Sequence, residues 1–198
     1  MAKVQPLPGA ASPSPSPYSS SDEQRSRQTY TVWMKSLVFN GNGCTVYTAD
    51  GGVAFRVDNY GCRGGREAFF MDRAGNTLIR IRRKGFGMFR RWWEVCRVAG
   101  EDDEATPWFS VRRAEKGGAA VTMHGGAGTC FRVDGCCARK SDYRVTGGGA
   151  VVAEVARKQT AAGVVLGEDV LSLTVGPEVD HLLVLGLVVV RGLMNRSL

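Results

Sequence analysis

The feature that most limits the fold of this chain is an apolar stretch near its carboxyl end, residues 179 to 194, with the sequence VDHLLVLGLVVVRGLM. No polar side chain interrupts it between Leu182 and Val190. Asp180 suits the amino terminus of a helix and Arg191 lies near the other end, so the stretch predicts a helix. A helix that is apolar on all sides has to be surrounded.

A bilayer is a poor surrounding for this helix. A membrane-spanning helix needs about 20 apolar residues, whereas Arg191 interrupts this run and a polar Asn-Arg-Ser segment follows closely. We therefore expect no transmembrane span and a helix enclosed by the rest of the chain. A strand is the alternative, because three consecutive valines favour β structure, but the length and the lack of turn residues favour a helix. The predicted core residues of the helix are Leu182, Leu183, Leu185, Val188 and Val189.

The preceding residues, from Thr31 onward, carry short runs rich in Val, Phe, Tyr, Trp and Ile that alternate with polar residues. Such alternation is typical of strands with one core face and one solvated face, as where Ile79 and Ile81 oppose Arg80 and Arg82. Turn residues such as Asp50-Gly51 predict tight antiparallel hairpins and an early meander. Twelve strands are predicted: 31–38, 44–49, 52–58, 67–72, 76–84, 88–98, 107–114, 119–124, 129–134, 141–146, 150–158 and 169–175.

The amino-terminal 28 residues differ from the rest in being rich in Pro, Ser and Gln without a periodic apolar pattern. Such a segment cannot bury enough surface to offset its ordering entropy. We predict a disordered tail over 1–28 and a single domain over 29–198. The six cysteines and the absence of an apolar secretory signal predict free thiols in a reducing compartment, hence a cytoplasmic protein.

Several segments resemble the plant LURP-one-related family. They are TVWMKSLVFNGNGCTVYTADGGVAFRVDNY, FFMDRAGNTLIRIRRK, WWEVCRV and DVLSLTVGPEVDHLLVLGLVVV, and the resemblance runs from about Tyr30 to the end. It implies a mainly β, Tubby-like fold: a closed barrel of about twelve antiparallel strands around one central apolar helix. It also implies a relationship to Tubby carboxyl-terminal domains and phospholipid scramblases, and a role in plant defence. The family offers no agreed catalytic residues to carry over.

The basic character of the chain, formally +7, is concentrated between residues 73 and 97, where eight cations accompany the single acid Glu94. Arginines interleaved with aromatic residues suit an anionic phosphate surface, because guanidinium groups engage phosphate oxygens and Trp92 suits a lipid interface. Tubby relatives bind phosphoinositides. A solvated basic hairpin without a ligand is the alternative. The candidate lipid-binding or anion-binding residues are Arg80, Arg82, Arg83, Lys84, Arg90 and Arg91.

Catalytic and metal sites are not expected. The two histidines, His124 and His181, have no coherent arrangement of acids or nucleophiles around them, and His181 suits a structural role. Cys136 and Cys137 could be acylated or join a metal site, but the spacing lacks a second well-separated pair, so free thiols are predicted. We expect no catalytic residues, no metal and no cofactor.

The sequence thus predicts a non-enzymatic module that binds a membrane phosphoinositide or a protein partner, peripheral at the plasma membrane, as a membrane-tethered regulator in plant defence. One alternative is a transcription regulator that binds nucleic acid, although no recognition helix or stacking platform supports it. A structural protein-interaction domain without a lipid ligand is another. Lipid translocation is the weakest, because the apolar helix is short for an element spanning a membrane.

Overall fold

The computed structural model describes residues 27–35, 43–58, 67–85, 92–99, 104–114, 117–126, 130–135 and 142–195. The predicted disordered tail, 1–28, lies outside these ranges except for its last two residues.

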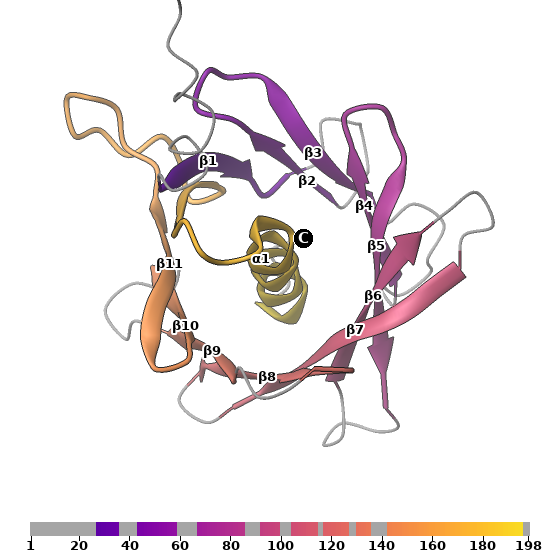
Figure 1. Ribbon diagram of the computed structural model, residues 1–198. Helices are drawn as coiled ribbons and strands as arrows, with labels where there is room; N and C mark the ends of the chain where they lie inside the picture. The colour runs from indigo at the N-terminus through magenta and orange to yellow at the C-terminus, as the bar shows by residue number, and fades with distance from the viewer. Residues whose placement is uncertain are drawn as a thin grey trace, which may run out of the picture.

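Twelve antiparallel strands close into one barrel, as predicted (Figure 1). Each strand pairs with the next along the chain, and β12 closes the barrel against β1, so the meander extends over the whole domain. The first and seventh strands each begin three residues earlier than predicted, at Gln28 and Glu104. The strands are β1 Gln28–Trp33, β2 Gly43–Tyr47, β3 Val53–Asp58, β4 Glu67–Asp72, β5 Thr77–Lys84, β6 Trp92–Ala99, β7 Glu104–Arg113, β8 Ala119–Met123, β9 Phe131–Gly135, β10 Tyr143–Gly147, β11 Ala150–Arg157 and β12 Val170–Val175.

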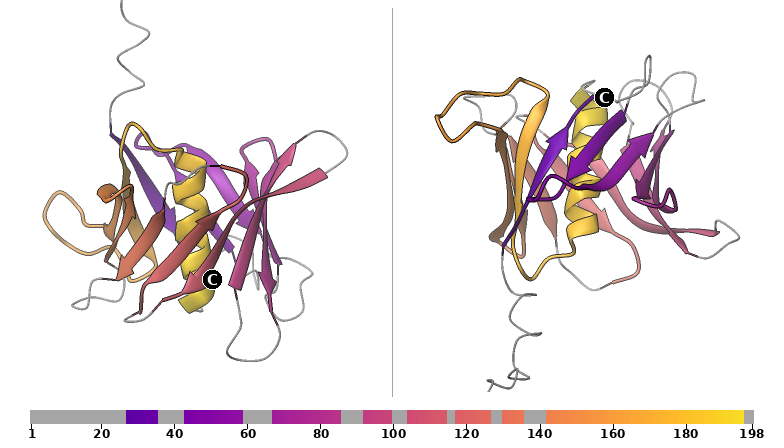
Figure 2. Two further views of the ribbon diagram at one scale, coloured as in Figure 1. Left: turned by 60° about the horizontal axis from the view of Figure 1, so that its bottom comes forward. Right: turned by 90° about the horizontal axis from the view of Figure 1, so that it is seen from above.

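The predicted apolar helix, α1 His181–Asn195, runs through the middle of the barrel (Figures 1 and 2). It begins two residues later than predicted because Asp180 is its amino-terminal cap. The Asp180 carboxylate accepts hydrogen bonds from the backbone N–H groups of Leu182 and Leu183, at 2.9 and 3.3 Å. Of the predicted helix core residues, Leu183, Leu185, Val188 and Val189 are buried, and Leu182 is partly buried against the core.

Gly186 sets the distance between the helix and the barrel wall. A Cβ atom at this position would lie 3.2 Å from Cδ1 of Ile79 and 3.3 Å from Cζ of Phe109. Both of these side chains belong to the inward rows of their strands and are fully buried. A glycine here therefore lets the helix backbone approach β5 and β7, and the helix fills the interior that side chains alone fill in smaller barrels.

The two ends of the barrel are named here after the end of α1 that lies at each: the helix N-terminal end and the helix C-terminal end. At the helix N-terminal end, Arg97 pairs with Asp180. At the helix C-terminal end, the Arg113 guanidinium donates a hydrogen bond of 2.7 Å to the carbonyl of Met194, and Arg191 donates one of 3.0 Å to the carbonyl of Gly117. Each strand runs between these ends, so a strand has one terminus at each.

Candidate functional site

Strand β5 carries the described part of the predicted basic site. Its inner row includes the buried Ile79 and Ile81, and its outer row carries Arg80, Arg82 and Lys84, as the alternation predicted. Both outer arginines reach one acid on β4: Arg80 pairs with Glu67, and Nε of Arg82 lies 2.8 Å from Oε1 of the same carboxylate.

The pairing with two arginines changes the pKa of Glu67. Burial raises its pKa, but the hydrogen bonds from Arg80 and Arg82 outweigh burial and hold the pKa below its ordinary value. One carboxylate facing two guanidinium groups leaves a surplus positive charge. The outer wall of β5 is therefore a partly neutralised basic surface rather than a row of free cations.

Of the remaining predicted cations, Arg83 and Lys84 lie toward the helix C-terminal end. Lys84 pairs with Glu94 on β6 at 3.3 Å, and the half-buried Arg83 lies in register with Trp93. Arg112 of β7 lies with its guanidinium 5.2 Å from the centre of the Trp92 ring. Arg90 and Arg91 lie outside the described residues. The structure thus brings Arg80, Arg82, Arg83 and Lys84 onto one strand.

Charge differs between the two ends when only the described residues are considered. At the helix N-terminal end, the four cations Arg27, Arg56, Arg73 and Arg97 are outnumbered by the five acids Asp50, Asp72, Glu104, Glu178 and Asp180. At the helix C-terminal end, nine cations accompany six acids: Lys35, Arg82, Arg83, Lys84, Arg112, Arg113, Arg157, Lys158 and Arg191, with Asp58, Glu67, Glu94, Asp142, Glu168 and Asp169. Within the described residues, the cations of the basic segment 73–97 are divided between the two ends. The excess of cations over acids lies at the helix C-terminal end.

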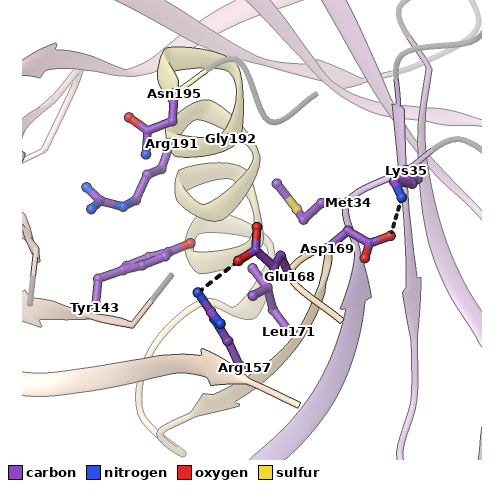
Figure 3. A pocket seen from close by; sticks show the side chains of 10 residues that line it. All are labelled: Met34, Lys35, Tyr143, Arg157, Glu168, Asp169, Leu171, Arg191, Gly192 and Asn195. Atoms are coloured by element: carbon purple, nitrogen blue, oxygen red, sulfur yellow. Dashed lines mark hydrogen bonds and ion pairs between the residues drawn. The ribbon is translucent and has the colours of Figure 1, made fainter. Parts of the chain in front are cut away.

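A cavity of about 450 Å³ opens at the helix C-terminal end (Figure 3). Its apolar lining comes from Met34 and Leu171. Two ion pairs lie at its edge: Lys35 with Asp169 at 3.2 Å, and Arg157 with Glu168 at 3.5 Å. The remaining lining residues are Tyr143 of β10 and Arg191, Gly192 and Asn195 of the last turns of α1.

Arg191 is the least expected residue of this cavity, because only 9% of it is exposed and no described carboxylate pairs with it. Its guanidinium lies 4.4 Å from the centre of the Tyr143 ring, and its Nε has no hydrogen-bond partner within the described part of the chain. Burial lowers the pKa of Arg191 and the nearby Arg113 lowers it further, while Tyr143 opposes both. A buried cation without an acid is costly unless an anion accompanies it.

Tyr143 adds a polar group beside this cation. Burial raises the pKa of its hydroxyl above the ordinary value, although Arg191 opposes the rise. The hydroxyl has no hydrogen-bond partner among the residues described and points into the cavity (Figure 3). It is neutral at physiological pH and can donate a hydrogen bond to a ligand. Sequence reasoning used Arg191 to place the carboxyl end of the helix and to exclude a membrane span, but not as a site residue; its position inside an apolar helix was the available signal of a site.

The polar residues His181 and Cys44 lie outside this cavity. Nδ1 of His181 lies 3.0 Å from the Tyr30 hydroxyl, which donates to Gln28, so this histidine ties the start of α1 to β1. The free thiol of Cys44 is buried, and burial with the nearby Asp58 raises its pKa to about 12. Cys136 and Cys137 lie outside the described residues. In the described ranges, no three His, Cys, Asp or Glu side chains gather as metal ligands do.

No helix in the described part of the chain is both long enough and apolar enough to cross a bilayer.

Comparison with known proteins gives a consistent result. The family model described as LURP-one-related matches residues 28–192. The chain is 36% identical to "Protein LURP-one-related 11" of Arabidopsis thaliana, over 98% of this chain and 89% of that protein. It is also 36% identical to "Protein LURP-one-related 4" from the same plant, over 91% of this chain and 82% of the relative.

Among solved structures, the X-ray structure of an Arabidopsis thaliana protein matches with a TM-score of 0.61. The match covers 86% of this chain and 93% of the other at 22% sequence identity. This similarity supports the barrel fold.

Proposed function

This chain belongs to the LURP-one-related family, and we propose that it is a non-enzymatic module that binds the phosphate groups of membrane phosphoinositides at the helix C-terminal end of its barrel. The observation that carries the proposal is Arg191, a buried cation without a described acid beside a cavity. The family resemblance supports the remainder of the proposal, that the protein acts as a membrane-tethered regulator in plant defence on the cytoplasmic face of the plasma membrane.

The chemistry of the cavity suits a phosphate group. Guanidinium groups bind phosphate oxygens through charge-assisted hydrogen bonds. The Arg191 guanidinium and the Tyr143 hydroxyl supply donors from one side of the cavity, where partial burial strengthens each interaction. An anion bound here would supply the missing counter-charge for Arg191.

Electrostatic attraction to an anionic membrane would also turn the helix C-terminal end toward the lipid. Each Lys or Arg near an anionic leaflet contributes about 1 kcal/mol to binding. The cation excess lies at the end that also holds the cavity, so attraction would present the cavity to the head groups. Arg80 and Arg82, paired with Glu67 on the wall, contribute less to such attraction than Arg83 and Arg112, for which no carboxylate partner is found among the described residues.

A charge-reversal experiment tests the proposal. Vesicles of phosphatidylcholine containing a phosphatidylinositol bisphosphate are pelleted with the wild type, with Arg83→Glu/Arg112→Glu, and with Arg56→Glu/Arg73→Glu as a control of equal charge at the helix N-terminal end. We expect at least a tenfold loss of affinity in the first variant and a much smaller loss in the control. A wild type that does not pellet, or two variants that weaken equally, contradicts the proposal.

A further inference from the structure

The connection between β11 and β12 is an ordered hairpin that extends outward from the barrel wall (Figures 1 and 2). Gln159 and Val165 form an antiparallel bridge. The N–H of Thr160 donates to the carbonyl of Val164 at 2.8 Å, and the N–H of Leu166 donates to the carbonyl of Lys158 at 3.0 Å. Gly163, with φ of 79°, provides the left-handed residue of the turn. These bonds fix the shape of the loop.

The tip of this hairpin is apolar and exposed. The exposed fractions of Val164, Val165 and Leu166 are 62%, 41% and 52%. Within the described residues, four large apolar side chains are exposed, and three of them lie in this loop. No charged residue occurs from Gln159 to Gly167. A contiguous apolar patch on an ordered, projecting loop marks a surface that contacts another apolar phase.

We propose that residues 160–166 form an insertion loop that enters the boundary between head groups and acyl chains of an anionic membrane. This inference rests on the proposed function. The loop leaves the barrel at the helix C-terminal end, where Arg157 and Glu168 both flank it and line the cavity. Insertion of the tip by about 5–10 Å would therefore bring the cavity to the level of the head groups.

The size of the apolar tip favours a lipid surface over a protein partner. A specific protein interface buries about 1,000 Å² or more, and three aliphatic side chains on one hairpin provide only a fraction of that area. Membrane binding, in contrast, adds the burial of a few apolar side chains to electrostatic attraction. Three cations lie at the base of the hairpin: Lys35 and Arg157, which pair with Asp169 and Glu168, and Lys158.

The test replaces the apolar tip without changing charge. Val164→Ser/Leu166→Ser is compared with the wild type and with Val151→Ser, a control whose valine is 47% exposed but lies near the helix N-terminal end. Binding is measured by pelleting with phosphatidylcholine vesicles containing a phosphatidylinositol bisphosphate, at about 0.1 M and 0.5 M salt. The second condition screens electrostatic attraction.

We expect the wild type and Val151→Ser to keep measurable binding at high salt, and the loop variant to lose about tenfold in affinity under both conditions with unchanged melting. A loop variant that binds like the wild type at both salt concentrations overturns the insertion loop but leaves the proposed function standing. A wild type that fails to bind at either salt concentration overturns both. A wild-type dimer that Val164→Ser/Leu166→Ser converts to monomer also overturns the insertion loop, since the tip would then contact a second copy.

Discussion

The two ends of the barrel use charge in different ways. At the helix N-terminal end, acids are satisfied by nearby groups: Asp72 accepts bonds from Asn76, and Asp180 caps α1 and pairs with Arg97. At the helix C-terminal end, Arg191 is buried without a described acid, beside a cavity and an exposed apolar hairpin. The two ends therefore differ in whether their charges have described partners, and the proposed binding site lies at the end where Arg191 has none.

The same helix produces both ends. Its first residues are held by Asp180 and by the contact of His181 with Tyr30. Its last turns place Arg191, Gly192 and Asn195 in the wall of the cavity. The position of the cavity therefore depends on the buried middle of the helix.

The largest effect is expected from a charge in that buried middle. Leu185 and Val188 are each 1% exposed, so Leu185→Asp or Val188→Asp would bury a carboxylate without a partner. We expect a loss of several kcal/mol in the free energy of unfolding, enough to unfold the barrel. Thermal or urea unfolding followed by circular dichroism measures it, with Asn195→Asp at the exposed last residue of α1 as the control. If either core variant melts like the wild type, the helix is not the core of the barrel.

A smaller effect should distinguish the arginines at the two ends. Arg97 pairs with Asp180 and lies 3.9 Å from the centre of the Trp108 ring, so Arg97→Met should cost about 1 kcal/mol of stability. Arg191→Met replaces a buried, unpaired charge, so its stability should stay within about 1 kcal/mol of the wild type. Urea unfolding gives both values.

Lipid binding should show the opposite order for these two variants. We expect Arg191→Met to weaken vesicle binding strongly while Arg97→Met binds like the wild type. Strong destabilisation of Arg191→Met with unchanged vesicle binding would mean that Arg191 is a structural residue.

The smallest effect concerns acid stability. A hydrogen bond from Trp33, at 2.9 Å, and one from Lys35 lower the pKa of Asp169 from its ordinary 3.8, although burial opposes them. Because the pKa is lower in the folded state, the stabilisation is fully present above pH 3.8 and is lost as the pH falls through the folded value. Asp169→Asn should therefore be less stable than the wild type near neutral pH, by up to about 1 kcal/mol.

The difference in melting temperature between wild type and Asp169→Asn should shrink below pH 4. Melting curves between pH 7 and pH 2.5 measure it. If the difference in melting temperature stays constant over this range, the pKa of Asp169 is the same in the folded and the unfolded protein, which contradicts the prediction.

Sequence reasoning predicted the strands and the apolar helix because both depend on local patterns, whereas the closed barrel was implied by the family resemblance. Period-two alternation placed Ile79 and Ile81 inside and Arg80 and Arg82 outside, and the uninterrupted apolar run placed the helix. The position of Asp180 as a cap was also visible in the sequence.

The candidate site depends on residues far apart in the chain and was predicted only in part. Pairing of Glu67 with Arg80 and Arg82 follows from the register of β4 on β5, which local patterns do not specify. The surroundings of Arg191 come from Gly117 and Tyr143, which lie on separate elements. The exposed tip of the β11–β12 hairpin became visible only with the accessibility of its side chains.

The central claim is that the helix C-terminal end faces the membrane. Amide hydrogen exchange of the protein, with and without vesicles containing a phosphatidylinositol bisphosphate, measures this orientation directly. We predict added protection at 83–85, 112–114 and 160–166 on vesicles, with unchanged exchange in the turns at 48–52, 73–76 and 148–149. Added protection in those turns, with none at 160–166, would contradict the account.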